Sequence, residues 1–235
     1  MRGKKCESQG IDMKIPRHIY QTYVQTTPFM RSWQQQSGWQ HHFFDDVACR
    51  LFVKQHLEPA VYNAYTRLTP GAARADLWRY CVLWVHGGVY VDADCTCLAP
   101  LDEWIGKETE LVVPVDHEHN PVLHLFQAVL ACTPRHPVMR KAIDAVVGHV
   151  QTGQHRHSIF DLSGPTCLGR CLNAEQGRPT ERTWSEGDST PQLRLLRHRR
   201  FKDDSVLWQG RKVVQSQEPI VRPGPSYRQQ KRFFR

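Results

Sequence analysis

The pattern of apolar and polar residues is most informative between residues 74 and 100. Apolar residues in its first half recur with the spacing of one helix face, and they are Leu77, Cys81, Trp84 and Val85. Gly87 and Gly88 follow, and such a pair is typical of a helix end and a tight turn. The short apolar run 89–91 then predicts a strand. This stretch is therefore predicted to be an amphipathic helix, a glycine turn and a strand in immediate succession.

The same patterning predicts further strands and helices on both sides of that unit. The predicted strands are residues 15–23, 41–46, 111–115, 123–132 and 212–214, and the predicted helices are 47–57, 59–68 and 138–150. Asp46 is placed to cap the first of these three helices, and Pro137 to open the last. Residues 173–191 are expected to form a surface loop, and no element is assigned to the strongly basic stretch 193–201.

Two carboxylates, Asp92 and Asp94, stand directly after the predicted strand 89–91. If the strand conformation persists through them, their side chains share one face of the sheet. Two carboxylates on one face repel each other unless a cation lies between them. Hard oxygen ligands suit Mg²⁺ or Mn²⁺, which usually keep open positions for substrate phosphates. The spacing therefore predicts a divalent metal at the strand end, ready to receive a diphosphate.

The helix before this strand carries polar residues that a core helix does not need. Asp76 and Arg79 are three residues apart, so they are neighbours on the helix surface. They can form a surface ion pair with a purely structural role. Alternatively, the carboxylate can bind ribose or sugar hydroxyls while the guanidinium binds a phosphate. The spacing alone is consistent with both interpretations.

The combined motif resembles a known enzyme family. Residues 75–80, with Asp76 and Arg79, are followed by Gly-Gly-Val-Tyr-Val-Asp-Ala-Asp at 87–94. This pattern resembles the DXD sugar transferases of glycosyltransferase family 32, which include initiating α-1,6-mannosyltransferases and capsular polysaccharide transferases. Clostridial glucosylating toxins share the same core pattern. A lone DXD is weak evidence, whereas the whole pattern is specific, and the resemblance extends over about residues 15–170.

The resemblance implies a GT-A-type, Rossmann-like α/β fold with a mostly parallel central sheet. It implies transfer of a sugar from a UDP- or GDP-sugar donor to a hydroxyl of a glycan or lipid-linked glycan, with retention of anomeric configuration. Asp92 and Asp94 would hold Mn²⁺ or Mg²⁺, and Arg79 would assist them in catalysis. No carboxylate is identified as a nucleophile.

The resemblance also implies a set of donor-binding residues: Tyr23, Asp76, Arg79, Gly88, Tyr90, Asp92, Ser163 and Gly164. Tyr23 would stack on the nucleotide base, although an ordinary strand tyrosine explains it equally well. Ser163 and Gly164 belong to a Ser-Gly-Pro-Thr run that would lie near the donor sugar and also suits a helix start. The C-terminal His or Trp motif of many family members is not found. Residues 215–216 stand in its place, which leaves the last metal or phosphate ligand open.

Length and composition add expectations about organisation and location. A chain of 235 residues is long enough for one domain, predicted at 15–235 after a flexible leader at 1–14. No stretch has the apolar character of a signal peptide or a transmembrane helix, which predicts a cytoplasmic enzyme of bacterial or viral type. The eight cysteines are expected to be reduced.

The formal charge of +8 suits nucleic acid, an anionic membrane surface or an acidic substrate. No nucleic-acid-binding motif accompanies the charge, so nucleic acid is not expected as a partner. The basic tail at about 222–235 carries aromatic residues and predicts loose peripheral contact with anionic lipid.

Two other functions fit parts of the sequence. Residues 89–96 match the apolar-DxDxT phrase of haloacid-dehalogenase phosphatases, in which Asp92 would be a nucleophile and Asp94 an acid and base. Such enzymes also need a late lysine and acidic pair, for which residues 202–204 are the candidates. A non-catalytic basic binding protein is the third possibility, and it leaves the spacing of the motif unexplained.

Overall fold

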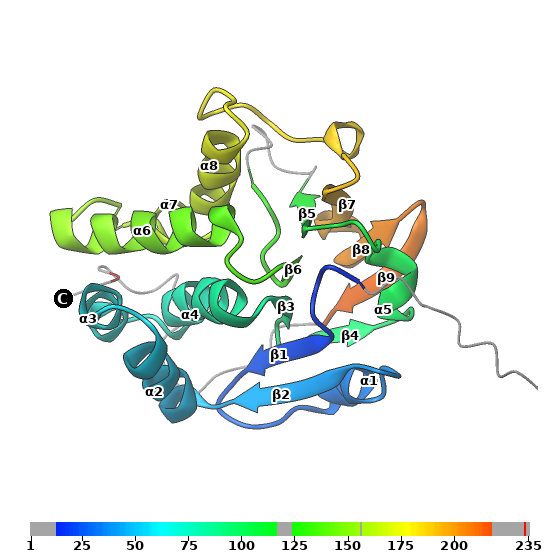
Figure 1. Ribbon diagram of the computed structural model, residues 1–235, viewed down its shortest axis with the longest axis horizontal. Helices are drawn as coiled ribbons and strands as arrows, with labels where there is room; N and C mark the ends of the chain where they lie inside the picture. The colour runs from blue at the N-terminus through cyan, green and yellow to red at the C-terminus, as the bar shows by residue number, and fades with distance from the viewer. Residues whose placement is uncertain (1–12, 117–123, 156, 218–232, 234–235) are drawn as a thin grey trace, which may run out of the picture.

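The computed structural model describes residues 13–116, 124–155, 157–217 and 233, and its strands form one sheet. The sheet has nine strands in the order β2-β1-β3-β6-β5-β7-β8-β9-β4 (Figure 1). The strands are β1 (His18–Thr22), β2 (Gln40–Phe44), β3 (Gly88–Val91), β4 (Cys95–Cys97), β5 (Leu111–Asp116), β6 (Val129–Cys132), β7 (Leu193–Arg199), β8 (Ser205–Trp208) and β9 (Arg211–Ser216).

The sheet is mixed, which corrects the expectation of mostly parallel strands. Three of the eight strand pairings in the described part of the chain are parallel, namely β1 with β2, β1 with β3, and β5 with β7. The other five pairings are antiparallel. Strand β6 runs opposite to both β3 and β5, strands β7, β8 and β9 form a meander, and β4 pairs with β9 at the edge of that meander. Short connections can join only antiparallel neighbours, whereas a parallel pair needs a long crossover.

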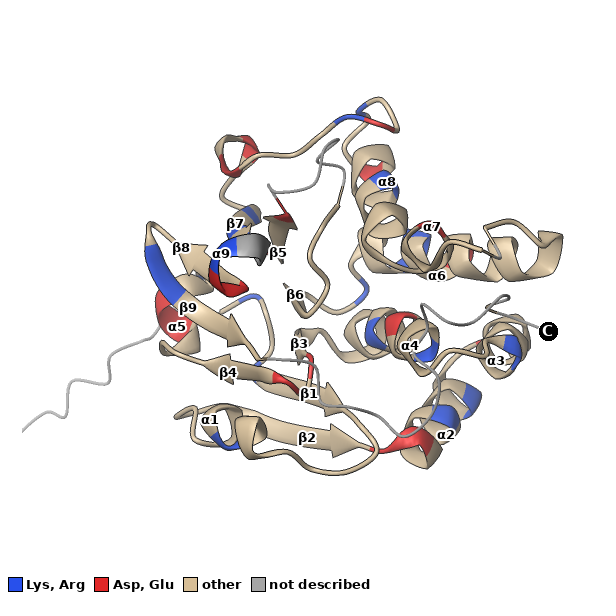
Figure 2. Cartoon of the chain, turned by 180° about the vertical axis from the view of Figure 1, so that it is seen from behind, with Lys and Arg blue, Asp and Glu red and all other residues tan. Residues whose placement is uncertain are grey.

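Helices cover both faces of the sheet. They are η1 (Pro28–Met30), α1 (Arg31–Gln34), α2 (Asp46–His56), α3 (Pro59–Arg67), α4 (Gly71–His86), α5 (Leu101–Trp104), α6 (Pro137–Thr152), α7 (Ile159–Leu162), α8 (Pro165–Glu175), η2 (Glu186–Asp188) and α9 (Arg200–Asp203). Figures 1 and 2 show the longer helices gathered on one side of the strands.

Alternating strand residues separate two hydrophobic cores, one on each face. Tyr20 and Tyr90 belong to the core under the longer helices, whereas Ile19 and Val89 belong to the core that contains Trp33 and Trp104 of α1 and α5. The two cores therefore pack against both faces of β1 and β3.

Helix α4 is the central helix, and it differs from the predicted amphipathic helix. Every residue from Asp76 to Leu83 is buried, the two charged residues included. The helix is enclosed because α3 and α6 pack against it and β3 follows it directly. Of the predicted apolar face, Leu77 and Cys81 are buried, whereas Trp84 and Val85 are only partly buried.

The glycine pair after α4 is required by close backbone contacts. Gly87 and Gly88 have φ angles of +65° and +96°. A Cβ atom at Gly88 would lie 2.6 Å from the carbonyl oxygen of His18, and one at Gly87 would lie 2.6 Å from the nitrogen of Pro134. Side chains at these positions would prevent β3 from entering between β1 and β6.

Three further elements differ from the sequence predictions. Strand β3 ends at Val91, so the strand conformation does not persist to Asp94, and the peptide N–H of Cys95 closes a turn onto the carbonyl of Asp92 at 3.1 Å. The predicted strand 123–132 is confirmed only as Val129–Cys132. The basic stretch 193–201 contains the seven-residue strand β7, whose residues Leu193, Leu195, Leu196 and His198 are buried.

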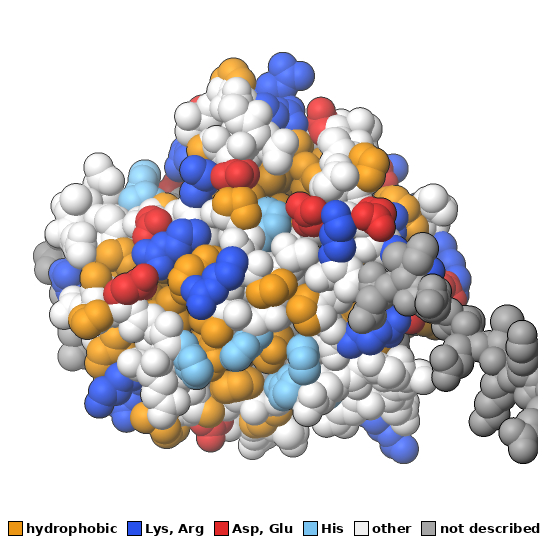
Figure 3. Space-filling model, in the orientation of Figure 1, with side chains coloured by type: hydrophobic (Ala, Val, Ile, Leu, Met, Phe, Trp, Pro, Cys, Tyr) orange, Lys and Arg blue, Asp and Glu red, His pale blue; other side chains and the backbone are white. Residues whose placement is uncertain are grey.

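Histidine and aromatic side chains gather at the amino ends of β1 and β3. Figure 3 shows histidines among hydrophobic side chains on this face of the molecule. Ring nitrogens Nδ1 of His18 and Nε2 of His42 are 3.0 Å apart, and the rings of His42 and His86 stack on Tyr20. Burial lowers the pKa of His42 and His86, and neighbouring imidazoles lower it further. These histidines are therefore held in an environment that favours the neutral form.

Within the described residues, no helix combines the length and apolar character needed to cross a bilayer. The seven cysteines of that part of the chain are free and buried. The predicted leader, apart from residues 13–14, and the basic tail, apart from Phe233, lie outside the described residues.

Candidate functional site

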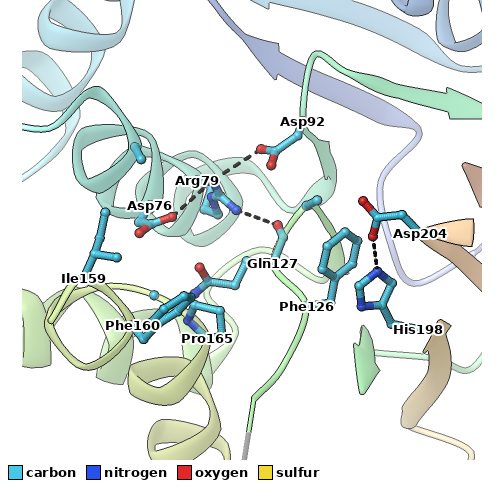
Figure 4. A pocket seen from close by; sticks show the side chains of 13 residues that line it. Asp76, Arg79, Asp92, Phe126, Gln127, Ile159, Phe160, Pro165, His198 and Asp204 are labelled. Atoms are coloured by element: carbon cyan, nitrogen blue, oxygen red, sulfur yellow. Dashed lines mark hydrogen bonds and ion pairs between the residues drawn. The ribbon is translucent and has the colours of Figure 1, made fainter. Parts of the chain in front are cut away.

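A cavity of about 270 Å³ opens beside α4 and the end of β3. Figure 4 shows its lining side chains projecting from several elements. One group comes from α4, the end of β3 and the start of α8, and comprises Ala72, Asp76, Arg79, Asp92, Gly164 and Pro165. The other group comprises Phe126, Gln127, Ala128, Ile159, Phe160, His198 and Asp204. Four segments that are distant in sequence therefore build one site.

Arg79 is the residue around which the first group is organised. Its Nη2 lies 3.1 Å from Oδ1 of Asp76 and 3.3 Å from Oδ1 of Asp92, while Nη1 donates to the carbonyl of Gln127 at 2.7 Å. The guanidinium also lies over the ring of Tyr90, 4.5 Å from its centroid. Burial opposes its charge, but Tyr90, Asp92 and Asp76 outweigh that effect and raise the pKa of Arg79. The guanidinium is thus a fixed positive charge beside the cavity.

Asp76 is held from two sides at the cavity wall. Arg79 contacts its Oδ1, and the hydroxyl of Ser163 donates to its Oδ2 at 2.8 Å. Burial raises the pKa of Asp76 to about 6, although Arg79 and Ser163 act in the opposite direction. The Asp76 side chain is only 9% exposed and that of Arg79 only 6%, so the interpretation as a surface ion pair is wrong.

Asp92 completes this group from the end of β3. Its Oδ1 receives the hydroxyl of Tyr90 at 2.5 Å and the contact from Arg79. Both contacts fall on one oxygen, so Oδ2 has no hydrogen-bond partner among the described residues. The side chain is 33% exposed, which leaves that oxygen accessible to a ligand.

Asp94 lies in the turn after β3 and does not line the cavity. Burial and the charge of Asp92 raise its pKa to about 6, and the thiol of Cys95 lies 3.7 Å from its Oδ1. The two carboxylates are therefore close enough to interact, although the expected reason, a shared strand face, is wrong. Within residues 13–116, 124–155 and 157–217, no three His, Cys, Asp or Glu side chains are grouped so as to hold a metal ion.

Ser163 and Gly164 connect α7 to α8 beneath the cavity. Gly164 lines the cavity as the residue before α8, whereas Ser163 is fully buried behind it and binds Asp76. Tyr80 of α4 donates its hydroxyl to the carbonyl of Ser163 at 2.7 Å. The structure therefore brings the Ser-Gly-Pro-Thr run to the helix that carries Asp76 and Arg79.

Two residues predicted to bind the donor lie elsewhere. Tyr23 does not line the cavity, and its ring is buried in a small cluster with Met30 and Ala93 of the DXD turn. Gly88 lies at the opposite end of β3 from Asp92, where the contact with His18 explains the glycine. Of the predicted set, the cavity wall thus includes Asp76, Arg79, Asp92 and Gly164, while Tyr90 and Ser163 support it from behind.

Several cavity residues had no assigned role in the sequence analysis. They include Phe126, Gln127 and His198, and Asp204 had none in the glycosyltransferase interpretation. Gln127 holds Arg79 through its carbonyl, and its side-chain amide contacts the hydroxyl of Tyr80. The only sequence signal for Asp204 was the acidic pair 203–204, which had been considered solely for the phosphatase alternative.

Comparison with known proteins finds a match that contains four residues of the first group, Ala72, Asp76, Arg79 and Asp92. The sequence of residues 21–111 matches a family described as "Glycosyltransferase sugar-binding region containing DXD motif". Residues 21–111 are therefore similar to the sugar-binding region of DXD glycosyltransferases. The resemblance inferred from the sequence is thereby confirmed, and the matched region contains Asp76, Arg79, Tyr90, Asp92 and Asp94.

Among curated relatives, an initiation-specific α-1,6-mannosyltransferase of Candida albicans is 35% identical over 101 residues, covering 42% of this chain and 25% of that protein. An uncharacterized glycosyltransferase of Acanthamoeba polyphaga mimivirus is 30% identical over 101 residues, covering 43% of this chain and 39% of that protein. The chain therefore spans between a quarter and two fifths of the length of these relatives.

A solved structure, the PaToxG glycosyltransferase, shares the fold. It superposes with a TM-score of 0.52 at 16% identity, over 68% of this chain and 70% of that one. The GT-A-type α/β fold predicted from the resemblance is confirmed, with the mixed sheet described above. The match to the DXD region also favours this family over the phosphatase alternative.

Proposed function

We propose that this protein is a glycosyltransferase that moves a sugar from a UDP- or GDP-sugar to a hydroxyl of a glycan, free or lipid-linked. The observation that carries the proposal is the ion-pair group in which the buried Asp76 and Arg79 meet the partly exposed Asp92, and which faces the cavity from within the region matched to DXD glycosyltransferases. Charged side chains whose pKa is shifted by burial and by a specific charge partner, and which face a cleft, are candidates for a functional site.

The chemistry of these side chains suits a nucleotide-sugar donor. Arg79 is a fixed cation that can contact a diphosphate oxygen. Because its position is already set, the site does not have to rearrange when negative charge develops on the leaving group. Asp76 accepts hydrogen bonds, so it can bind hydroxyls of the donor sugar. Transfer with retention needs no protein nucleophile in this proposal, because the acceptor hydroxyl attacks on the face from which the diphosphate leaves.

The residues also suit a divalent cation, Mn²⁺ or Mg²⁺. Asp92 offers its Oδ2, and Asp94 supplies a second carboxylate two residues along the turn. Two carboxylates are the usual protein contribution for such an ion when a diphosphate and water complete its shell. When bound, the cation would neutralise charge on the leaving diphosphate. Tyr90 and Arg79 orient Asp92 through its other oxygen.

The decisive experiment compares Asp92→Asn and Asp94→Asn with the wild type. Melting temperatures are measured with and without Mn²⁺ plus UDP or GDP, alongside hydrolysis of UDP- and GDP-sugars. Each variant loses one charged metal ligand with little change of shape, so donor hydrolysis should fall by more than about tenfold. Mn²⁺ and nucleotide should raise the melting temperature of the wild type far more than that of either variant.

Ligand-free Asp94→Asn should melt at or above the wild-type temperature, because it removes one of two carboxylates that repel each other. Ligand-free Asp92→Asn should melt below Asp94→Asn, because it also weakens the contacts of Asp92 with Arg79 and Tyr90. Asp144→Asn is a matched control, since Asp144 is an exposed carboxylate on α6 that pairs with Arg140. Equal stabilisation by Mn²⁺ and nucleotide in all these proteins would show that the pair does not hold the metal. Trapping of beryllofluoride on Asp92 would instead support the phosphatase alternative.

A further inference from the structure

We propose that Phe126 and Asp204 form an acceptor subsite that binds an uncharged sugar ring on the cavity wall opposite Arg79. This inference rests on the proposed function, and it assigns residues that lie outside the region matched to DXD glycosyltransferases. Figure 4 shows Phe126, His198 and Asp204 together on one side of the cavity and Asp76 and Arg79 on the other.

Phe126 supplies an aromatic surface whose orientation is fixed. The imidazole of His198 stacks on its ring with centroids 3.7 Å apart and an angle of 13° between the planes. The peptide N–H of Phe126 donates to the carbonyl of Pro114 at 2.8 Å, which anchors the backbone on β5. Phe126 is partly exposed and lines the cavity. An aromatic face with negative electrostatic potential attracts the weakly positive C–H groups of a sugar ring.

Asp204 supplies a hydrogen-bond acceptor beside this ring. Its side chain is 44% exposed, and its Oδ1 accepts a hydrogen bond from Nε2 of His198 at 2.7 Å. Its backbone has φ +47° and ψ +45°, a conformation uncommon for residues other than glycine, although Asp tolerates it better than most. The carbonyl of Asp204 receives the N–H of Ser216 at 2.9 Å. Its position is thus determined by the turn, by β9 and by His198 together.

His198 acts as a positioning residue for both groups. It is only 1% exposed, and its two ring nitrogens face carboxylates, Nε2 toward Asp204 and Nδ1 toward Asp116 at 3.9 Å. Because a carboxylate accepts, Nε2 must carry the hydrogen of the short contact. The buried imidazole of His198 therefore stacks on Phe126 with its face and hydrogen-bonds Asp204 with its edge.

The charge of this wall selects the ligand. Arg79 is the only Lys or Arg among the described residues that line the cavity, and it belongs to the opposite group. A carboxylate repels phosphate, whereas it accepts strong hydrogen bonds from hydroxyl groups. An aromatic ring with one adjacent carboxylate thus suits a neutral sugar, while the diphosphate belongs beside Arg79. Binding sites of this kind combine apolar surface with a few placed polar groups.

The test is direct binding of methyl α-D-mannopyranoside, measured by saturation-transfer NMR in the presence of Mn²⁺ and the nucleotide that stabilises the wild type. Asp204→Asn and Phe126→Ala should each weaken binding at least about fivefold. Asp203→Asn is the matched control, because it removes the same charge one residue away, where the carboxylate contacts Lys212 and Arg199 and does not line the cavity. It should bind the sugar as the wild type does.

A second pair of variants tests the positioning role. His198→Phe keeps an aromatic ring against Phe126 but removes the donor to Asp204, whereas His198→Gln keeps an N–H donor. Sugar binding should be weaker in His198→Phe than in His198→Gln, while nucleotide still raises the melting temperature of both. Equal binding by the two would overturn the role given to His198.

The outcomes separate this inference from the proposed function. Asp203→Asn, whose side chain does not line the cavity, should retain stabilisation by Mn²⁺ and nucleotide together with donor hydrolysis, in which water replaces the acceptor. Wild-type sugar binding by Asp204→Asn, or no sugar binding by the wild type, would overturn the acceptor subsite and leave donor chemistry intact. Loss of stabilisation by Mn²⁺ and nucleotide in Asp204→Asn would also overturn it, because Asp204 would then serve the metal. A wild type that neither binds nucleotide nor hydrolyses a donor would refute the proposed function itself.

Discussion

The buried position of Arg79 allows one substitution to test the organisation of the site. In Arg79→Lys the positive charge remains, but one ammonium group replaces a planar fork whose two terminal nitrogens contact three partners. An ammonium placed between Asp76 and Asp92 cannot also reach the carbonyl of Gln127. The lysine also loses the flat contact with the ring of Tyr90.

The expected cost follows from these contacts. A buried acceptor left without its donor costs about 1–3 kcal/mol, which applies to the carbonyl of Gln127. Weaker pairing with two partly buried carboxylates adds to that, so the free energy of unfolding should fall by about 2–4 kcal/mol. The guanidinium is also the proposed phosphate contact, and donor turnover should fall more than about tenfold, or about 1.4 kcal/mol of transition-state stabilisation.

Urea unfolding measures the first effect and hydrolysis of the donor sugar measures the second. The control is Arg170→Lys, because Arg170 also contacts two carboxylates, Asp161 and Glu181, but is 31% exposed and lies outside the cavity. It should change the free energy of unfolding by less than about 1 kcal/mol and leave turnover unchanged. If Arg79→Lys matched this control in both assays, the buried ion-pair arrangement and its role would both be refuted.

Two further predictions concern the scaffold. Gly88→Ala should lower the free energy of unfolding, measured in urea, by more than about 2 kcal/mol, because its Cβ would lie 2.6 Å from the carbonyl oxygen of His18. The control is Gly148→Ala on α6, where a Cβ has open space, and this variant should raise the free energy of unfolding by about 0.5–1 kcal/mol. The pKa values of His42 and His86 are lowered in the folded protein, so below the ordinary value of 6.5 the unfolded chain binds protons that the folded chain excludes. The contribution of these two histidines to the free energy of unfolding is therefore complete above pH 6.5 and is lost as the pH falls below it. Unfolding curves at about pH 7.5 and about pH 5.5 measure this effect. The free energy of unfolding should fall less between these two pH values in the double variant His42→Gln/His86→Gln than in the wild type, and an equal fall would contradict the role given to the two histidines.

The donor side of the site could be predicted from the sequence because it is local. Asp76, Arg79 and Asp92 come from one helix, one glycine turn and one strand within 17 residues, and the resemblance of this stretch to DXD sugar transferases assigned them to one donor site. The burial of the Asp76–Arg79 pair could not be predicted in this way. It depends on Ser163 and Gln127, which reach α4 from segments about 50 to 90 residues away in sequence.

The prediction for Asp94 shows the limit of periodicity as an argument. A two-residue spacing places side chains on one face only while the strand continues, and β3 ends at Val91. The turn after it is stabilised by partners that are remote in sequence. Asp92 N–H donates to the carbonyl of Ala128 at 2.8 Å, and Gln217 N–H donates to that of Asp94 at 2.9 Å. Nothing within residues 87–94 encodes either contact.

The opposite wall could not be predicted because strand pairing between segments that are distant in sequence creates it. The alternation in 193–199 is irregular, since Leu195 and Leu196 are consecutive and both buried, and arginines obscure the apolar positions. The parallel pairing of β7 with β5 places His198 opposite Asp116. The short connection from β7 to the antiparallel strand β8 places Asp204 within hydrogen-bond distance of the His198 imidazole. A chain that keeps the 76–92 motif can therefore keep its donor chemistry while the 126 and 198–204 segments change independently. In the proposed function, the motif therefore concerns the donor, and the proposed acceptor subsite lies in the second wall.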